Sequence, residues 1–496
     1  MSKLYGGIDI GLKEFHFHAM DGDGNPIGKP RRFTNNVPGM KQLVDHLDLH
    51  IHKQGATSVS LGMEATGLYW FPLFQALQQD ERIGQWNTQL LAMNPKLVES
   101  FRQAYPDVDK SDPVDALIIA DRVRFGRGIA PQHIHSEQFL SLQRLTRFYV
   151  HLIQQQTDLK NYASSFLYLT FSEWIRCKPF SDRYGATACR LMKKYKSAEE
   201  MAEMTSDELE ALLKDFSKNH FRDPKQKAED VLAMARNSFT IPPGLVDSVH
   251  LLIKQTLQQL DLLEKHLDRL TKQIEKAMKG IKNPLISIPG IGLVSAALII
   301  AEIGDISRFE IESKLAKYAG LTWRTKQSGN FRAEETFMTK TGNVYLRRGL
   351  MIAAQSMVNH NDEYNDYYQR KFNEATRHAH KRALSLTARK LVRLVHAMLS
   401  TNQLYMTPEE RMKRNKEVDN QSTDLPSVDN EAGEETPAVD AVRNVGNPAS
   451  DLKKEHKKVK GTAAATSSTR QWVGTHRIQN PRLTQSARNT LHLTPM

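Results

Sequence analysis

The pattern of apolar and polar positions divides the chain into an alternating first part and a helical remainder. Residues 4–92 alternate between strand-like and helix-like stretches. Strands are predicted at 5–12, 58–64 and 86–93, a hairpin at 15–18 and 28–33, and a helix from Pro38 to about Lys53. Residues 95–126 are helical and basic. This order predicts an α/β domain over residues 1–130, whose site lies at the ends of strands.

Beyond residue 130 the apolar spacing is that of helices. Leucines and a tyrosine recur at three- and four-residue steps in a long helix from Ser136 to about Arg176. A second long helix, with heptad-like spacing between Leu260 and Ile274, ends near Lys279. The less periodic residues 180–243 predict a small helical insertion. Residues 131–282 therefore read as a coiled-coil region, whose two long helices either pair with each other or form an oligomer contact.

Residues 283–405 are predicted to form a helical C-terminal domain that ends in a helix at 382–400. The run at 288–296 contains Gly290 and Gly292 and fits the hairpin of a helix-hairpin-helix element. Glycines in such a hairpin let backbone amides approach a phosphate. A tight helix–helix turn without a ligand explains the pattern equally well. After Pro408 the apolar periodicity stops, so residues 406–496 are predicted to be a mostly disordered tail.

Composition and charge narrow the partners. The 496 residues carry a formal net charge of +12, and 40% are hydrophobic. This composition is typical of a soluble protein with more than one domain, and the basic balance favours a polyanion such as nucleic acid. The most apolar segment, 285–303, is interrupted by Pro289 and two glycines, so no membrane association is expected. Two cysteines without Cys-x-x-Cys spacing suit a reducing cytoplasm.

Four carboxylates are candidate metal ligands. Asp9 stands between two isoleucines in the first strand, and Glu64 ends a later strand. Asp112 and Asp115 would share an edge of the first turn of a helix. Burying a carboxylate is costly unless a cation meets it. The simpler explanations are a strand-end aspartate at Asp9 and a helix cap at Asp112.

The histidines of the hairpin and a serine at residue 328 are further candidates for functional residues. His16 and His18 alternate with phenylalanines in the hairpin, and we expect them to face solvent. Ser328 precedes a glycine in a loop that also contains Arg324, Lys326 and Arg332. This serine is either a nucleophile amid phosphate-binding charge or a residue that hydrogen-bonds the backbone of a turn.

Taken together, these motifs resemble the insertion-sequence one-ten family of transposases, which are bridge-RNA-guided DNA recombinases with an acidic DEDD motif and a catalytic serine. The runs at 7–11, 62–67 and 110–116 resemble the three acidic motifs. The C-terminal domain matches at 288–292, 302–309, 319–322, 328–329 and 340–348. The resemblance covers roughly residues 4–400, and Trp323 departs from it where the family usually has a proline. The strand order is similar to a ribonuclease-H-like (RuvC-like) domain.

The resemblance implies a mechanism and partners. Asp9, Glu64, Asp112 and Asp115 would bind Mg²⁺, and Ser328 would form a covalent phosphoserine–DNA intermediate. Expected nucleic-acid contacts are Arg324, Lys326, Arg332, Lys340, Arg347, Arg348, Gly290 and Gly292. Implied partners are double-stranded DNA of the element ends and target, a non-coding guide RNA, and further copies of the chain in a dimer or tetramer. The expected location is the bacterial cytoplasm, at the nucleoid.

Three other functions fit parts of the sequence. A ribonuclease-H-like or junction-resolving nuclease would use Asp9, Glu64 and Asp115 without a covalent intermediate and would not need Ser328. An actin-like sugar kinase also begins with an Asp-x-Gly strand, but the net charge and the absence of further glycine-rich nucleotide loops disfavour it. A non-catalytic RNA-binding scaffold would need only the charge and the glycine hairpin.

Overall fold

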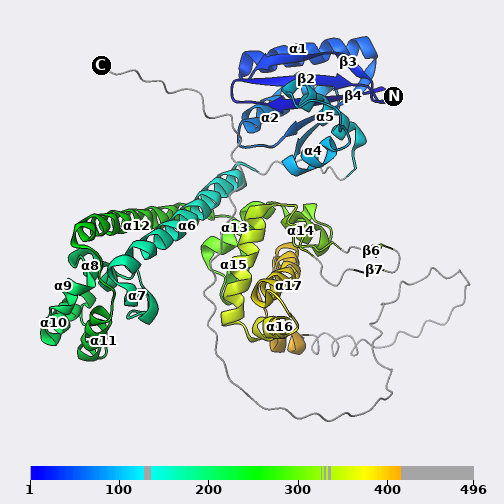
Figure 1. Cartoon of the computed structure of the whole chain (residues 1–496). Helices are drawn as coiled ribbons and strands as arrows, with labels where there is room; N and C mark the ends of the chain where they lie inside the picture. The colour runs from blue at the N-terminus through cyan, green and yellow to red at the C-terminus, as the bar shows by residue number, and fades with distance from the viewer. Residues whose placement is uncertain (1, 128–135, 325–326, 329–330, 333–336, 415–496) are drawn as a thin grey trace, which may run out of the picture. The chain divides into compact units, whose positions relative to one another are not determined.

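The computed structural model describes residues 2–127, 136–324, 327–328, 331–332 and 337–414 (Figure 1). Its larger apolar clusters mark three parts: a sheet domain, a helical insertion, and a C-terminal helical domain that also packs against the two long helices. Of the predicted tail, residues 406–496, only 406–414 are described, and 408–414 are helical; the rest lies outside the described residues. Within them, no helix is long and apolar enough to cross a membrane.

The sheet of the first domain has five strands in the order β3-β2-β1-β4-β5. Strands β1 to β3 are antiparallel neighbours, whereas β4 pairs in parallel with both β1 and β5. The strands are β1 (Ser2–Ile10), β2 (Glu14–Met20), β3 (Pro26–Thr34), β4 (Ala56–Glu64) and β5 (Thr88–Met93). The predicted hairpin and the predicted strands are therefore confirmed, and the fold is a mixed α/β domain.

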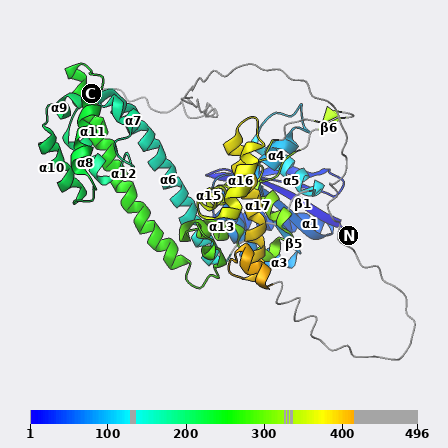
Figure 2. The same ribbon diagram turned by 90° about the horizontal axis from the view of Figure 1, so that it is seen from below.

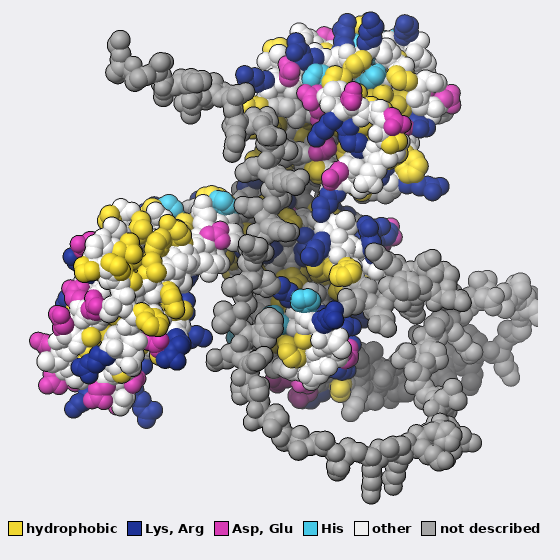
Figure 3. All heavy atoms as spheres, viewed as in Figure 1, with side chains coloured by type: hydrophobic (Ala, Val, Ile, Leu, Met, Phe, Trp, Pro, Cys, Tyr) yellow, Lys and Arg dark blue, Asp and Glu magenta, His cyan; other side chains and the backbone are white. Residues whose placement is uncertain are grey.

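Helices cover both faces of this sheet. In Figure 1, α1 (Val37–Gln54) lies on one side and α5 (Asp112–Phe125) on the other. On the α1 side, Ile8, Phe17 and Leu61 are almost completely buried with apolar residues of α1. The shorter helices are α2 (Trp70–Gln79), α3 (Glu81–Gln85) and α4 (Pro95–Arg102). The predicted helical stretch 95–126 is thus two helices, α4 and α5. Elsewhere on this domain, Lys and Arg side chains gather over α1 and β3 (Figure 3).

The helix on the second face of the sheet corrects the prediction that His16 and His18 face solvent. Only 15% of the His16 side chain is exposed, and the prediction is also wrong for His18. Its side chain is buried, with 6% of the residue exposed, rather than facing solvent. His18 pairs with Gly7 of β1, on the face of the sheet that α5 covers. Strand alternation places His18 opposite Phe17, but it does not say whether that face meets water. Burial lowers the pKa of His18, so its ring is neutral at physiological pH.

The two long helices, α6 (Glu137–Thr170) and α12 (Pro243–Ala277), pack against each other within one chain. They run side by side in both Figure 1 and Figure 2. Leu142 and Leu152 of α6 and Leu267 of α12 join one apolar cluster with the C-terminal helices. Of the two alternatives left open by the heptad-like spacing, the structure therefore shows the pairing within the chain.

The insertion is helical, as predicted, and has its own core. Trp174, Leu191, Leu209 and Val231 are fully buried there, and the ends of both long helices contribute apolar residues. Its helices are α7 (Ser172–Cys177), α8 (Ala186–Lys194), α9 (Ala198–Ala202), α10 (Ser206–Ser217) and α11 (Pro224–Arg236). Asp and Glu side chains gather at its far end, around α9 and α10 (Figure 3).

The C-terminal domain is built around α13 (Leu293–Ile303), in which every residue from Ala296 to Ile303 is buried. Packed around it are α14 (Glu312–Ala319), α15 (Val344–His360), α16 (Asp362–Asn373) and α17 (Ala379–Thr401), with short 3₁₀ turns at Pro284–Ser287 and Ile306–Arg308. Between α14 and α15 the chain forms a two-stranded hairpin, β6 (Gln327–Ser328) and β7 (Phe331–Arg332).

Candidate active site

Two glycines in the sheet domain let α5 lie directly against the strands. A Cβ atom on Gly7 would overlap the main chain of Ala116 and Ala120 in α5. A Cβ atom on Gly62 would overlap the side chain of Val123. No larger residue fits at either position without moving α5. The contact with β1 and β4 therefore fixes the position of α5, and with it the first turn of that helix.

The same two glycines show on which face the acidic residues lie. Side chains alternate along a strand, so Asp9 lies on the face of Gly7 and Glu64 on the face of Gly62. Both carboxylates therefore lie on the α5 side of the sheet, at the carboxyl ends of neighbouring parallel strands. Asp112 and Asp115 stand in the first turn of α5. The fold thus gathers all four predicted carboxylates in one region.

The electrostatics of Asp9 are unusual. Burial, and then the charges of Asp112 and Glu64, raise the pKa of Asp9 to about 6. The backbone amide of Ile10 and the ammonium group of Lys110 offset this shift only in part. Negative charges that face one another in a partly desolvated region favour protonation or the arrival of a cation.

Each of the other three carboxylates has a neighbour of its own. The hydroxyl of Thr66 donates a hydrogen bond to Glu64. Nδ1 of His16, which pairs with Asp9 across β1 and β2, lies 3.7 Å from Oδ2 of Asp112. Asp115 forms an ion pair with Arg102 of α4. Asp115 therefore has a direct ion-pair partner in the chain, whereas for Asp9 the charge of Lys110 offsets the raised pKa only in part.

Asp112 does not cap its helix. Helix α5 begins at Asp112 itself, and the residue in the N-cap position is Ser111, which makes no side-chain cap bond. The structural explanation offered for Asp112 is therefore wrong. Its side chain is 68% exposed, and the start of a helix favours negative charge.

The donor set suits a hard divalent cation, because all four side chains supply carboxylate oxygens. In the described parts of the chain, however, no three His, Cys, Asp or Glu side chains form a group that would hold a metal ion as they stand. Glu64 and Asp112 are close enough to raise the pKa of Asp9, but the three carboxylates do not form such a group.

The predicted nucleophile lies on the hairpin of the C-terminal domain. The stem of this hairpin is held by the amide of Thr339 donating to the carbonyl of Thr322 at 2.8 Å, and by their hydroxyls 3.0 Å apart. Ser328 is the last residue of β6 and pairs with Phe331 across the tip. Lys326 lies outside the described residues, and for Ser328 and Arg332 only the backbone is described.

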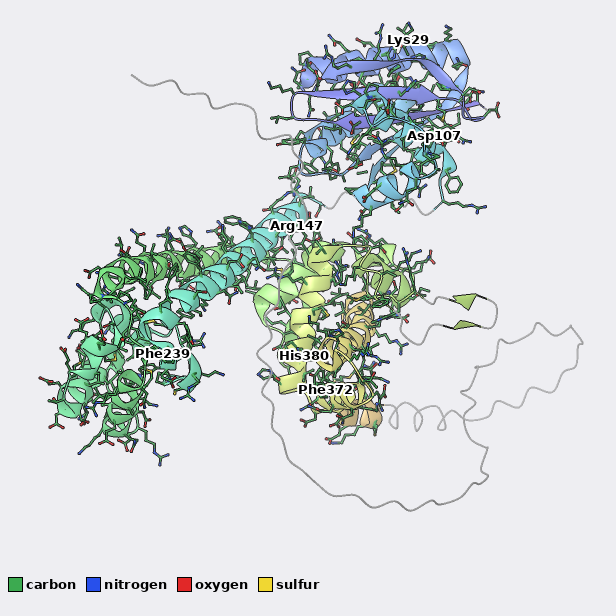
Figure 4. All side chains as sticks on the ribbon, viewed as in Figure 1. Lys29, Asp107, Arg147, Phe239, Phe372 and His380 are labelled. Atoms are coloured by element: carbon green, nitrogen blue, oxygen red, sulfur yellow. The ribbon has the colours of Figure 1, made fainter. Side chains whose placement is uncertain are left out.

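A buried polar network anchors the base of this hairpin. Glu302 of α13 is completely buried and accepts two hydrogen bonds from Arg147 of α6, at 2.6 and 2.8 Å. Gln143 and Asn343 donate to the same carboxylate at 3.2 and 2.7 Å. The Asn343 carbonyl oxygen also caps α15. Figure 4 labels Arg147 where α6 meets the C-terminal helices.

Sequence reasoning placed Glu302 in a family motif but missed this role. Its main partner, Arg147, is 155 positions away in the chain. Sequence reasoning also missed the packing role of Gly7 and Gly62, which lie in the acidic motifs at 7–11 and 62–67. A direct signal existed for His16 alone, because consecutive strands usually pair and its strand follows the first strand directly.

The remaining predicted nucleic-acid contacts fall into two groups. Arg347 donates to the carbonyls of Ala319 and Lys340 at 3.0 and 3.3 Å, and Gly290, at φ +90°, packs against the carbonyl of Ser356. These two residues have local structural roles. Arg324 and Lys340 are exposed at the stem of the hairpin, Arg348 is partly exposed, and Gly292 borders open space at the start of α13.

Comparisons with known proteins identify the kind of protein to which this chain is similar. A family model named for the DEDD transposases of IS110 and described as a transposase matches residues 6–172. A second, described as the transposase IS116/IS110/IS902 family, matches residues 282–369. The chain is 24% identical over 414 residues to an uncharacterized 43.6 kDa protein of insertion element IS110 from Streptomyces coelicolor, covering 82% of this chain and 95% of that protein.

Two other relatives match over shorter stretches. An uncharacterized 44.8 kDa protein of insertion element IS116 from Streptomyces clavuligerus is 26% identical over 62% of this chain and 76% of its own length. The pilin gene-inverting protein of Moraxella bovis is 23% identical over 71% of this chain and 83% of its own length.

Both family models describe transposases and match in chain order, so the chain is a DNA transposase. It belongs to the IS110/IS116 family of insertion-sequence transposases.

Proposed function

We propose that this transposase cuts and rejoins DNA strands through a covalent bond to Ser328, with Mg²⁺ held by the carboxylates of the sheet domain. The observation that carries the proposal is the group formed by Asp9, Glu64 and Asp112, in which the pKa of Asp9 is raised to about 6. Such a group lacks positive charge where a metal-dependent DNA enzyme needs a cation. The family motifs supply the serine.

In this proposal the four carboxylates bind and orient the cation. Asp9, Glu64, Asp112 and Asp115 would hold the cation, and Asp115 would exchange its ion pair with Arg102 for it. When bound, Mg²⁺ would polarise the scissile phosphate and neutralise charge that develops on its oxygens. The raised pKa of Asp9 returns toward its ordinary value once a cation is near, because the charged form is then favoured.

The serine supplies the covalent step. The hydroxyl oxygen of Ser328 attacks the phosphorus, a new Ser–O–P bond forms, and the bond from phosphorus to one sugar oxygen breaks. The hydroxyl proton passes to the sugar oxygen that leaves. The reverse step, with a hydroxyl from another strand end, rejoins DNA without an external energy source. Arg324 and Lys340, at the stem of the hairpin, are placed to contact neighbouring phosphates.

The domain division proposed from the sequence gives this site two halves. Residues 1–130 carry the carboxylates and residues 283–405 carry Ser328, with the coiled-coil region 131–282 between them. We propose that the halves meet on DNA, within one chain or between chains of a dimer or tetramer. A non-coding guide RNA would choose the sequences by base pairing, and the site of action would be the bacterial nucleoid.

Trapping of protein–DNA adducts tests this function. Ser328→Ala should abolish covalent adducts on DNA carrying the element ends, while Ser313→Ala, at an exposed serine of α14, should leave them unchanged. Adducts that persist in Ser328→Ala would refute the nucleophile. Metal-dependent cleavage that persists without adducts would instead favour the alternative, a nuclease of this fold without a covalent intermediate.

A further inference from the structure

Helices α16 and α17 enclose a pocket that the proposed chemistry does not use. Its volume is about 350 Å³. The residues that line it are Tyr367, Arg370, Leu386, Arg389, Lys390 and Arg393. Four of these six are cationic, which identifies the pocket as a site for an anion.

The neighbouring acids neutralise this charge only in part. Glu312 lies 3.9 Å from Arg389 and 3.8 Å from Arg393, beyond hydrogen-bonding distance of both. Glu363 forms an ion pair with Lys390 at 2.9 Å, but it also pairs with Arg411 at 2.9 Å. Each glutamate is thus shared between two cations, and Arg370 adds further charge. The pocket therefore retains excess positive charge.

One cation at this pocket lacks a hydrogen-bond acceptor. Nη1 of Arg389 is buried and has no hydrogen-bond partner in the described parts of the chain. Burial also lowers the pKa of Arg389, since its charge is partly withdrawn from water. A buried donor is normally satisfied in a native protein. Phosphate oxygens would satisfy it, because a guanidinium group matches their geometry.

The remaining lining residues suit a sugar–phosphate strand. The ammonium group of Lys390 lies 5.0 Å from the ring centroid of Tyr367 and 4.6 Å from that of Tyr364. The guanidinium group of Arg370 lies 5.4 Å from the Tyr367 centroid. The rings hold these cations at the pocket, and Leu386 adds apolar surface for a sugar. Cationic groups, a donor without a partner and an apolar side chain therefore occur together at this pocket.

We propose that this pocket binds the phosphodiester backbone of the duplex DNA on which the transposase acts. DNA is the substrate of the enzyme class, whereas the guide RNA is itself a proposal. The pocket lies on α16 and α17, apart in the sequence from the carboxylates and the hairpin of Ser328. The inference therefore goes beyond the covalent mechanism and does not depend on it.

The test uses the full chain and a short duplex of unrelated sequence. In Arg370→Gln/Arg393→Gln, both changed side chains are exposed, so the fold should persist. Losing two phosphate contacts should weaken DNA binding by on the order of tenfold at physiological salt, and lower the slope of log K against log salt by about two. Fluorescence anisotropy over a salt series measures both quantities.

A matched control separates the pocket from general attraction to charge. Lys254→Gln/Lys265→Gln removes the same net charge from exposed positions of α12. Equal losses in the pocket and α12 variants would overturn the proposal. Weaker binding to single-stranded RNA of equal length, with duplex binding unchanged, would overturn it as well. Ser328→Ala should keep normal affinity and slope, so failure of the covalent mechanism and failure of the pocket are distinguishable.

Discussion

Two carboxylates that are withdrawn from water show how differently the two halves of this transposase are built. In the sheet domain, Asp9 faces other carboxylates, and its pKa is raised to about 6. In the C-terminal domain, Glu302 is completely buried, but Arg147, Gln143 and Asn343 satisfy it. Buried charge that the chain neutralises itself is a structural device, whereas buried charge left without a cation indicates a site for one.

The two halves also differ in how they hold the residues of the proposed site. Asp9, Glu64, Asp112 and Asp115 stand at strand ends and in a helix that Gly7 and Gly62 fix against the sheet. Ser328 stands at the tip of a hairpin fixed at its base by the Glu302 network. The carboxylates therefore stand on packed elements of the sheet domain, whereas Ser328 stands at the far end of a hairpin that is fixed at its base.

The largest effect on stability should come from breaking the ion pair between Arg147 and Glu302. Arg147→Met leaves the Glu302 charge buried without its main partner, and it should lower the free energy of unfolding by about 3–5 kcal/mol. Urea denaturation measures this loss. The double variant Arg147→Met/Glu302→Gln should recover most of it, because no charge then remains. A loss of under about 1 kcal/mol in the single variant would show that the network does not brace the domain.

A smaller effect should follow from filling the contact beneath α5. Gly7→Ala forces a methyl group into the main chain of Ala116 and Ala120, and it should cost about 1–3 kcal/mol of stability. It should also weaken Mg²⁺ binding, since the first turn of α5 must move. Gly22→Ala is the control, because a Cβ atom there meets nothing within 4 Å. Equal stability and equal Mg²⁺ affinity in both variants would contradict the role of Gly7.

The smallest effect should be a pH dependence that arises from Asp9. The folded protein holds this proton more tightly than the unfolded chain, because the pKa of Asp9 is raised from 3.8 to about 6. Its contribution to stability is therefore present below about pH 4 and is lost as the pH rises through about 6. When a chelator has removed Mg²⁺, Asp9→Asn should no longer show this fall in the free energy of unfolding with rising pH. Asp107→Asn, at an exposed site labelled in Figure 4, should keep it.

A stability that does not change between pH 4 and 6 in the wild-type chain would contradict the environment described for Asp9. So would an identical pH profile in Asp9→Asn. Free energies of unfolding at a series of pH values, with Mg²⁺ removed, decide between these outcomes.

Much of the sheet domain follows from its sequence. The alternation of the first strands, the hairpin at 15–18 and 28–33, and the proline that opens α1 predict elements that the structure confirms. The acidic residues could be found because they end strands or begin a helix. The face of the sheet that these residues share could not be predicted, since it depends on which side of the sheet α5 covers.

Long-range contacts explain the features that sequence reasoning missed. His18 is buried because a helix far along the chain covers its face. Arg347, which stays a predicted nucleic-acid contact, also donates to main-chain carbonyls at the base of the hairpin. In the local sequence Glu302 is only an acidic residue that follows an apolar run. Its structural role becomes visible in the contact with Arg147 of α6.

Calorimetric titration of Mg²⁺ into the full chain at neutral pH tests the central claim most directly. Mg²⁺ should bind the wild-type protein, and Asp9→Asn should lose most of that affinity, while Asp107→Asn and Arg147→Met/Glu302→Gln should keep it. Unchanged Mg²⁺ affinity in Asp9→Asn would contradict the claim that the carboxylates of the sheet domain form the cation site.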